Sequence, residues 1–395
     1  MSSAVAFSYG LCLFSMGIGD DGHQQMLEEA AEAAGGDILV HAEGYWESKS
    51  SDLVMTDTDR LLSTVEGVEG VRAAIPRMII NGLVSSANGN RVLFLQGIDP
   101  VRERVLHDHS EDLQAGEFLD ETERDDPIIL GAIVVEKLEL ELGDRVVLTA
   151  TQPDGEVTRA LFHLTGVIET GLKDIDEVMG VTSLSAAQEA LGAEGMLTQI
   201  GVMTREGVPS DSVASLIEAS VRAQGNGLEV LTWQEAIPDM VGFIEVDDAF
   251  LYIYLVVILA IVAFAIANTF LMAVMERVRE FGLLNALGLR GTGVAGLLLA
   301  ETLLMTALAM SIGLVLGLAG HMAASHWGIP VAAWGVDSME VSGVDFASLV
   351  MRSKIIPAKW VAASILVALV TVGSALYPAW RASRLAPSEA MRFFG

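Results

Sequence analysis

The stretch MERVREFGLLNALGLRG, residues 275–291, joins two long apolar segments of the chain. Residues 250–275 carry no charged side chain, and residues 294–320 carry only Glu301. Either segment is long enough to cross a hydrocarbon core of about 30 Å as a helix. The charged stretch is therefore expected to be a short helix in the turn between two membrane-spanning helices.

This stretch has the spacing of an amphipathic helix. Leu284 and Leu287 are expected to share one face with Arg277, Glu280 and Phe281, because these positions follow the i, i+3/4, i+7, i+10 pattern. A short amphipathic helix at a membrane surface is a suitable docking element for a soluble partner. The alternative is a basic stop-transfer segment that only fixes the membrane topology.

The charges and glycines of the stretch favour docking over a simple anchor. Glu276 is expected to pair with Arg279, one helical turn further along. Gly288 and Gly291 allow the chain to turn back after the helix. A stop-transfer anchor needs neither the apolar face nor this order of charges.

The composition indicates a mixed protein, with spanning helices and a polar domain. Of the 395 residues 52% are hydrophobic, and the mean hydropathy is +0.48. Residues 20–248 hold 45 acidic and 14 basic side chains, a net charge of −31, whereas the rest of the chain has a net charge of +2. Such an acidic domain repels nucleic acid, and its acidity is best explained by solubility or by adaptation to salt.

Two further apolar segments complete the expected membrane part. Residues 361–377 form a short candidate span, and residues 4–18 form a thin one of about 15 residues without a basic flank. We expect the first helix to be incomplete. The single cysteine, Cys12, lies in this segment and has no partner for a disulfide within the chain.

The basic residues near the spans predict the orientation. Three arginines lie in the turn after residue 275 and three follow the last span: Arg277, Arg279, Arg290, Arg381, Arg384 and Arg392. Three basic residues oppose them: Arg352, Lys354 and Lys359. The majority places the turn and the C-terminal tail in the cytoplasm and the acidic domain outside it.

The expected organisation is thus an α-helical membrane protein with four transmembrane helices and a large extracytoplasmic α+β domain. The segments are a first helix at 1–19, the α+β domain at 20–248, a second helix at 249–275, a coupling helix at 276–293, a third helix at 294–320, a short outer loop at 321–359, a fourth helix at 360–378 and a cytoplasmic tail at 379–395.

The acidic domain alternates strand and helix patterns, which predicts an α+β fold of two lobes. The expected strands are 37–42, 91–97, 127–131, 144–150, 160–168, 199–204 and 228–233. The expected helices are 22–34, 56–68, 132–141, 184–192, 208–224 and 234–247.

The sequence has few motifs typical of metal-binding or catalytic sites. The sequence HDHSED, residues 107–112, resembles a metal cluster, but neither a cysteine nor a spaced set of carboxylates completes it, so a solvated acidic loop is the expected structure. There is no G-x-S-x-G and no G-x-x-x-x-G-K-[ST]. We therefore expect no catalytic residue, no metal site and no enzymatic activity in this chain.

Small residues line the expected third helix at Gly313, Gly317 and Gly320. The Gly-x-x-x-Gly spacing lets another helix approach closely, although such glycines are common in any spanning helix.

Two motifs are similar to those of a known family. ERVREFGLLNALG (276–288) resembles the E-R-x-R-E-[IF]-G-x-L-x-A-[LI]-G signature of FtsX/MacB-type ABC transporter permeases. ALYPAWRASRLAPSEAMR (375–392) resembles the C-terminal tail of that family. Segments such as GDILVHAEGYWE and LQGIDP resemble its lipoprotein-releasing (LolC/LolE-like) branch.

The resemblance implies a site that couples the permease to an ATPase. Its expected residues are Glu276, Arg277, Arg279, Glu280, Phe281, Gly282, Leu284, Ala286, Leu287 and Gly288. The matching tail residues are Pro378, Arg381, Pro387 and Arg392. Glu301 matches an acidic position of the third helix; it is either paired, with Arg290 or Arg381, or an interfacial residue.

The resemblance also implies partners and a place in the cell. A separate ABC ATPase dimer would bind ATP and Mg²⁺, while this chain binds no cofactor. A second permease copy or paralogue, lipoprotein cargo and a periplasmic carrier are the other implied partners, in a bacterial inner membrane. The family's carrier-binding hairpin has only a tight turn here, at 153–155 within residues 149–162, which leaves carrier recruitment open.

Two other functions remain alternatives within this family, and a third lies outside it. A MacB-like efflux permease normally carries its ATPase on the same chain. An FtsX-like regulator of a cell-wall hydrolase is expected to have a much shorter outer domain. A membrane-anchored binding module without an ATPase would not need the coupling helix.

Overall fold

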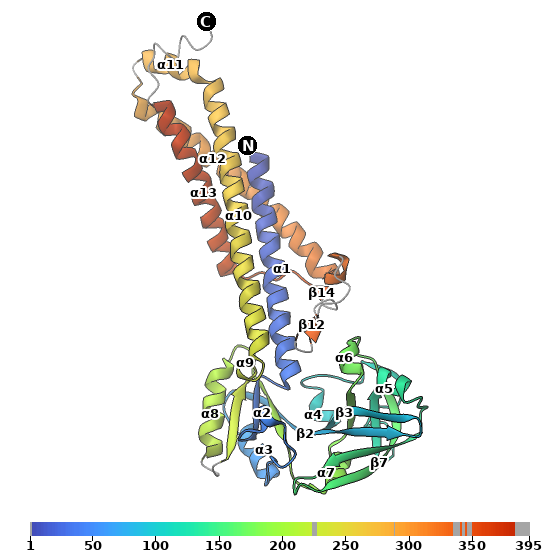
Figure 1. The fold of residues 1–395 in the computed structure, drawn as a ribbon. Coiled ribbons are helices and arrows are strands. Elements are labelled where there is room, and N and C mark those ends of the chain that lie inside the picture. Colours follow the sequence, from blue (N-terminus) through green and yellow to red (C-terminus); the bar gives the residue numbers. More distant parts are fainter. Residues whose placement is uncertain are drawn as a thin grey trace. The chain divides into compact units, whose positions relative to one another are not determined.

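The computed structural model describes residues 2–222, 227–287, 289–334, 340–341, 344–345 and 350–383. The chain divides into two compact units. Residues 1–26, 243–338 and 347–395 form the first, which we call the helical unit, and residues 27–242 with 339–346 form the second, the α+β unit (Figure 1).

The helical unit contains long helices, two of which meet the length and composition of a membrane span. Its helices are α1 (Ser2–Ala34), α10 (Pro238–Glu276), α11 (Val278–Ala286), α12 (Gly291–Trp327) and α13 (Pro357–Ser383), of which α1 and α10 continue into the α+β unit. Among the described residues, Gly291–Trp327 and Pro357–Leu376 are long and apolar enough to cross a membrane. The count of four spans stays a prediction.

Helix α1 is one continuous element of 33 residues, whereas the sequence predicted a thin span and a separate helix at 22–34. The polar turn after the apolar residues contacts residues 352–359, which run into the first turn of α13. Asp20 pairs with Lys359, Gln24 accepts a hydrogen bond from Lys354, and Asp21 accepts one from the backbone N–H of Arg352 at 2.7 Å. These are the three basic residues that opposed the predicted orientation, and their contacts let the helix continue through its charged turn.

The glycine stripe of α12 is a helix–helix seam, and its partner is α1. A Cβ atom added to Gly313 would lie 2.5 Å from the carbonyl oxygen of Ala6, and one added to Gly10 would lie 2.8 Å from the carbonyl oxygen of Gly313. Gly317 lies against Leu13, and Gly320 against the ring of Phe14. The seam suggested by the sequence is therefore confirmed, because any larger side chain would separate the two backbones.

The α+β unit is built on a sheet whose strand order is β10-β1-β9-β2-β3-β8-β5-β7-β4, with β6 pairing with both β2 and β7. The strands are β1 (Ile38–Ala42), β2 (Val71–Ser86), β3 (Gly89–Ile98), β4 (Leu113–Gly116), β5 (Pro127–Gly131), β6 (Arg145–Thr151), β7 (Val157–Ile168), β8 (Met179–Ser183), β9 (Gln199–Thr204) and β10 (Leu228–Thr232). The helices are α2 (Tyr45–Ser48), α3 (Thr58–Glu66), α4 (Pro100–Glu103), α5 (Ala132–Lys137), α6 (Lys173–Asp176), α7 (Leu184–Leu191), α8 (Ser210–Arg222) and α9 (Trp233–Ala236). Short elements follow α12: β11 (Ile329–Pro330), a 3-10 helix (Val331–Trp334), β12 (Glu340–Val341), β13 (Val344–Asp345) and β14 (Val350–Met351).

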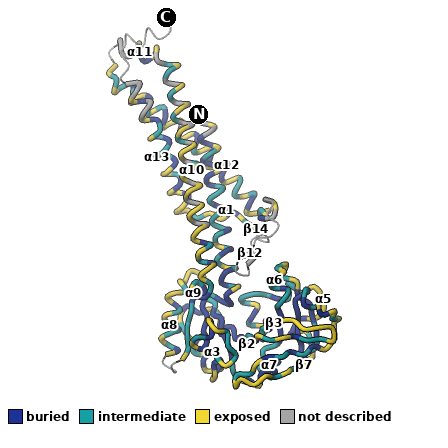
Figure 2. Tube along the Cα trace, in the orientation of Figure 1, coloured by how far each residue is buried: buried dark blue, intermediate teal, exposed yellow. Residues whose placement is uncertain are grey.

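Two hydrophobic cores correspond to the two predicted lobes. Strands β2, β3, β8, β5, β7 and β6 pair in a closed ring around one core, which includes Leu93, Leu148 and Phe162. The second core, with Ile38 and Ile217, lies between β1, β2, β9 and helices α3 and α8. Figure 2 shows these buried residues along the strands. The α+β class is thus confirmed.

Strand β2 belongs to both lobes and was missed from the sequence. Its N-terminal part pairs with β9 and its C-terminal part with β3 and β6. Pro76 and Gly82 interrupt its strand pattern, since proline cannot donate to a ladder and glycine weakens one. Pairing with β9 holds β2 extended at Pro76, and pairing with β3 and β6 on its two sides holds it extended at Gly82.

Candidate functional site

Helix α11, the core of the predicted coupling stretch, is held against the helical unit by one aromatic side chain. Phe281 is only 2% exposed. It packs with Leu284 of its own helix, Val294 and Leu298 of α12, and Ala375 and Ala379 of α13: these residues form one apolar cluster. Helix α11 therefore touches both α12 and α13 through this cluster.

The opposite side of α11 is open. Leu283 is 58% exposed and Leu287 is 78% exposed, and Glu276 and Arg279 are also exposed. The sequence predicted that Leu287 shares a face with Phe281; that prediction is wrong, because only Leu284 follows Phe281 into the cluster. The outer side of α11 therefore combines exposed leucines with an exposed arginine side chain, a composition suited to a protein partner.

Arg277, in the turn between α10 and α11, ties this stretch to α12. Its Nη1 donates to both carboxylate oxygens of Glu301, at 3.1 and 2.9 Å, and its Nε donates to Glu280 at 3.0 Å. The sequence suggested Arg290 or Arg381 as the partner of Glu301, and Glu276 with Arg279 as the local pair. Among the described side chains the contacts run from Arg277 instead, because the turn at Arg277 points its side chain back onto α12.

The remaining predicted coupling and tail residues are placed only by their backbone or not at all. Gly282 and Ala286 lie in α11, and Pro378 and Arg381 lie in α13 near Ala379. Gly288, Pro387 and Arg392 fall outside the described residues. The end of α13 thus meets α11 at the same end of the helical unit (Figure 1).

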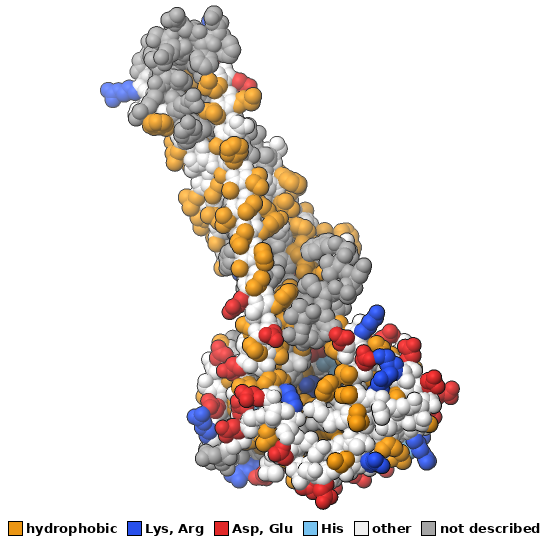
Figure 3. Space-filling view, in the orientation of Figure 1, with side chains coloured by type: hydrophobic (Ala, Val, Ile, Leu, Met, Phe, Trp, Pro, Cys, Tyr) orange, Lys and Arg blue, Asp and Glu red, His pale blue; other side chains and the backbone are white. Residues whose placement is uncertain are grey.

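Figure 3 shows the division of side-chain types that the composition predicted, with acidic side chains gathered on the α+β unit and apolar ones on the helical unit.

Within the α+β unit, however, one group of charged side chains is buried. Arg77, on β2, and Glu103, at the end of α4, form an ion pair with side chains 8% and 2% exposed. Nε of Arg77 donates to Glu103 at 3.2 Å, and Nη2 donates to the other carboxylate oxygen.

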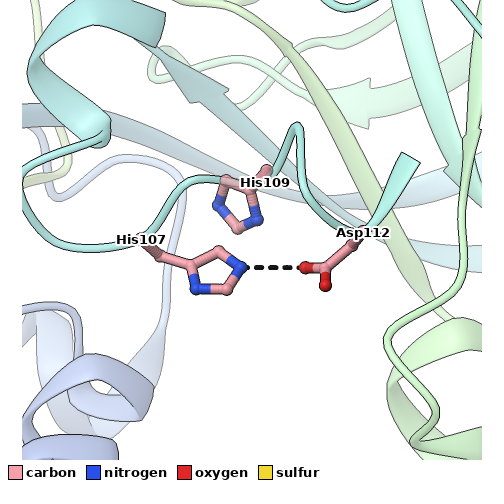
Figure 4. Close-up of side chains that lie close together, drawn as sticks. All are labelled: His107, His109 and Asp112. Atoms are coloured by element: carbon pink, nitrogen blue, oxygen red, sulfur yellow. Dashed lines mark hydrogen bonds and ion pairs between the residues drawn. The ribbon is translucent and has the colours of Figure 1, made fainter.

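The HDHSED loop lies beside this ion pair, with His109 near Glu103. Figure 4 shows three side chains of the loop: His107, His109 and Asp112. His107 Nε2 lies 2.8 Å from Asp112 Oδ2, its Nδ1 contacts Glu32 of α1, and His109 Nε2 lies 3.8 Å from Glu103. His109 is only 8% exposed, so the prediction of a solvated loop is wrong for this residue. The sequence missed this group because Glu32 and Glu103 come from other elements.

These contacts move pKa values in opposite directions. Hydrogen bonds to Asp112 and Glu32 raise the pKa of His107 to about 10. Burial raises the pKa of Glu29, one turn before Glu32, and the Glu32 carboxylate adds to this effect. Burial alone would raise the pKa of Glu103, but the charge of Arg77 and its hydrogen bonds, together with the nearby imidazole of His109, outweigh it and hold the pKa at about 2.

We expect the α+β unit to lose about 3 kcal/mol of stability as the pH falls from 4.5 towards 2, through protonation of Glu103. The carboxyl is more acidic in the folded state than its ordinary pKa of 4.5, so its contribution is complete above that pH and is lost below it. Amide hydrogen exchange of β2 and β9 in the full chain, corrected for intrinsic rates, measures the loss. A Glu103→Gln variant with an unchanged acid slope would refute this assignment.

Comparisons with known proteins agree with this arrangement of two units. The family model described as "FtsX-like permease C-terminal" matches residues 252–387, and that described as "MacB-like periplasmic core domain" matches residues 1–220. Between them they include α10 to α13 and most of the α+β unit.

Several curated proteins are similar along most of the chain. The lipoprotein-releasing system transmembrane protein LolC of Neisseria meningitidis is 25% identical over 377 residues, which cover 90% of this chain and 85% of that protein. The corresponding LolE of Haemophilus influenzae is 21% identical over 410 residues, 98% of this chain and 93% of that protein. Among solved structures, the periplasmic region of MacB from Actinobacillus actinomycetemcomitans is 14% identical, covers 53% of this chain and 95% of that one, and has a TM-score of 0.38.

The first motif and helices α11 to α13 fall within one family model, and most of the acidic α+β unit falls within the other, which alone matches more than half of the chain. The chain therefore belongs to the FtsX/MacB-type family of ABC transporter permeases, where its relatives include the LolC and LolE proteins.

Proposed function

We propose that this chain is the transmembrane permease subunit of an ABC transporter that extrudes lipoproteins from the inner membrane, driven by ATP hydrolysis on a separate ATPase subunit. The names of its LolC and LolE relatives suggest the cargo. The observation that carries the proposal is the two-sided character of α11, which is anchored inward by Phe281 and open outward at Leu283 and Leu287.

In this proposal the solvent-exposed side of α11 binds in a cleft of the ATPase. Closure of the ATPase dimer around ATP and Mg²⁺ displaces α11, while this chain binds neither. Phe281 and the Arg277–Glu301 ion pair pass the displacement to α12 and α13. The α1–α12 seam at Gly10 and Gly313 extends it to α1. The permease thus acts mechanically, and it has no catalytic residue of its own.

The double variant Arg279→Glu/Leu287→Glu is expected to lower co-purification of the ATPase roughly tenfold or more, since truncation of interface anchors commonly costs at least 1.4 kcal/mol. Both side chains are exposed, so the fold should be unaffected. The measurement is the molar ratio of ATPase to tagged permease after mild detergent extraction from the native host.

The matched control is Arg159→Glu, an exposed arginine on β7 of the α+β unit. It makes the same arginine-to-glutamate change as Arg279→Glu and is expected to leave the ratio at the wild-type value. If the double variant retains the ATPase as well as the control does, α11 is a membrane anchor and the proposed docking role fails.

The same purification also tests the proposed cargo and the other proposed partners. The turn between β6 and β7 is tight, with the N–H of Gln152 donating to the carbonyl of Glu156 at 2.8 Å, so this chain offers no protruding hairpin there for a periplasmic carrier. We therefore propose a second, different permease beside it as the carrier-binding subunit. Acylated lipoproteins in the purified complex support the proposal.

The two alternative functions predict that other proteins co-purify with this chain. A periplasmic adaptor without lipoproteins would indicate a MacB-like efflux permease, and a cell-wall hydrolase would indicate an FtsX-like regulator. The large α+β unit, residues 27–242, favours the transporter over the regulator.

A further inference from the structure

The loop between α4 and β4 brings together side chains that have no part in the proposed transport mechanism. His107, His109 and Asp112 each offer a ligand atom, and these atoms all lie within 4.8 Å of one another. Figure 4 shows the two imidazole rings side by side with the Asp112 carboxylate at one end. Two imidazoles and a carboxylate make up a ligand set that suits Zn²⁺ in proteins.

His109 supplies an independent observation that points to a ligand. Its side chain is buried, at 8% exposed, and neither ring nitrogen has a hydrogen-bond partner. A buried polar atom without a partner costs about 1–3 kcal/mol. A bound cation would satisfy one nitrogen of His109, whereas the carboxylate of Glu103 is 3.8 Å from Nε2, too far for a hydrogen bond.

The surroundings of His107 have the form of an outer shell around a metal ligand. Glu32 of α1 contacts Nδ1, so that the other nitrogen, Nε2, faces Asp112. Metal-ligating histidines commonly donate their second nitrogen to a carboxylate in this way, which fixes the tautomer and the ring orientation. Glu29 and Glu32 add negative charge on α1 that a divalent cation would offset.

We propose that His107, His109 and Asp112 bind a zinc ion, with Glu32 as the carboxylate that orients His107. A tetrahedral zinc ion holds its ligand atoms about 3.3 Å apart, so the side chains close in by up to about 1.5 Å on binding. The ion takes the place of the proton between His107 Nε2 and Asp112 Oδ2, and water occupies the fourth position. This site joins the last turns of α1 to the loop before β4, and it revises the expectation of no metal in this chain.

The test uses the full-length protein in detergent, stripped with a chelator and titrated with ZnCl₂ against a chromophoric zinc indicator. The wild type is expected to bind a single zinc ion per chain, which metal analysis after gel filtration counts. His109→Gln and Asp112→Asn are expected to weaken zinc binding by much more than tenfold, and Glu32→Gln by roughly 10- to 100-fold, as for other outer-shell partners. MgCl₂ and CaCl₂ are expected not to compete, because these ions prefer sites built from oxygen ligands.

The matched control is His163→Gln, which removes another histidine of the same unit that lies 2.8 Å from a carboxylate, that of Asp126. It is expected to bind zinc like the wild type. Asp112 is partly exposed, so Asp112→Asn keeps the test valid if His109→Gln misfolds. Cobalt replacing zinc should give the visible absorption of a tetrahedral site in the wild type and in His163→Gln only.

Two outcomes would overturn the proposal. One is a wild-type protein that retains no zinc after gel filtration. The other is zinc binding of equal strength in the wild type and in Asp112→Asn, which would place the ion on the general acidic surface of the α+β unit.

Discussion

Replacing Phe281 with alanine is expected to weaken the packing of α11 against α12 and α13. As a result, ATP hydrolysis is expected to become uncoupled from cargo release. Phe281 is 2% exposed and forms the centre of the cluster with Val294, Leu298, Ala375 and Ala379. Truncating a buried phenylalanine costs about 3–5 kcal/mol, and here the loss falls on the contact that holds one short helix. Amide exchange in α11 should therefore accelerate by roughly two orders of magnitude or more.

The functional measurement is ATP-dependent lipoprotein release from proteoliposomes that contain the complete transporter. We expect Phe281→Ala to reduce release per ATP hydrolysed, since α11 then moves without α12 and α13. Leu287→Ala is the matched control for exchange, because this side chain is 78% exposed and outside the cluster. Normal exchange and normal coupling in Phe281→Ala would show that the cluster does not transmit the motion.

The second large effect is expected in the α+β unit, where Arg77→Met should destabilise the fold by about 3–5 kcal/mol. The substitution leaves Glu103 charged, 2% exposed and without its guanidinium partner. An unpaired buried charge is far more costly than a missing pair, so the double variant Arg77→Met/Glu103→Leu should recover much of the loss. Amide exchange of β2 and β9 in the full chain measures both variants.

An exposed ion pair of the same unit provides the control. Arg102 and Glu66 lie 2.6 Å apart, but their side chains are 41% and 43% exposed. Arg102→Met should cost less than about 1 kcal/mol, because solvent screens the pair. Equal losses from Arg77→Met and Arg102→Met would mean that burial of the Arg77–Glu103 pair has no energetic consequence.

Much of the architecture was accessible from local patterns. The apolar runs around Glu276–Arg279 and the acidic composition of residues 20–248 separate a membrane part from an α+β domain. Strands such as Gln199–Thr204 and Pro127–Gly131 were predicted with their observed bounds. These features depend on hydropathy and on side-chain periods of a few residues, which a sequence displays directly.

Only the position of the candidate site along the chain could be predicted from the sequence. The motif at 276–288 marks the stretch proposed to couple to an ATPase, but the sequence could not tell that Phe281 turns inward while Leu287 stays exposed. At 3.6 residues per turn, Phe281 and Leu287 lie about 120° apart around the helix, and the direction in which α12 and α13 approach α11 covers only Phe281.

Tertiary structure alone decided the contacts between distant segments. Arg277 meets Glu301, 24 residues away, and β2 stays extended at Pro76 because it pairs there with β9, a strand more than 120 residues further along the chain. His107 reaches Glu32 of α1, which turns a sequence that looks like a solvated loop into a half-buried cluster. Local patterns of hydropathy and charge determine which elements form, whereas the packing and register of those elements determine which polar side chains meet.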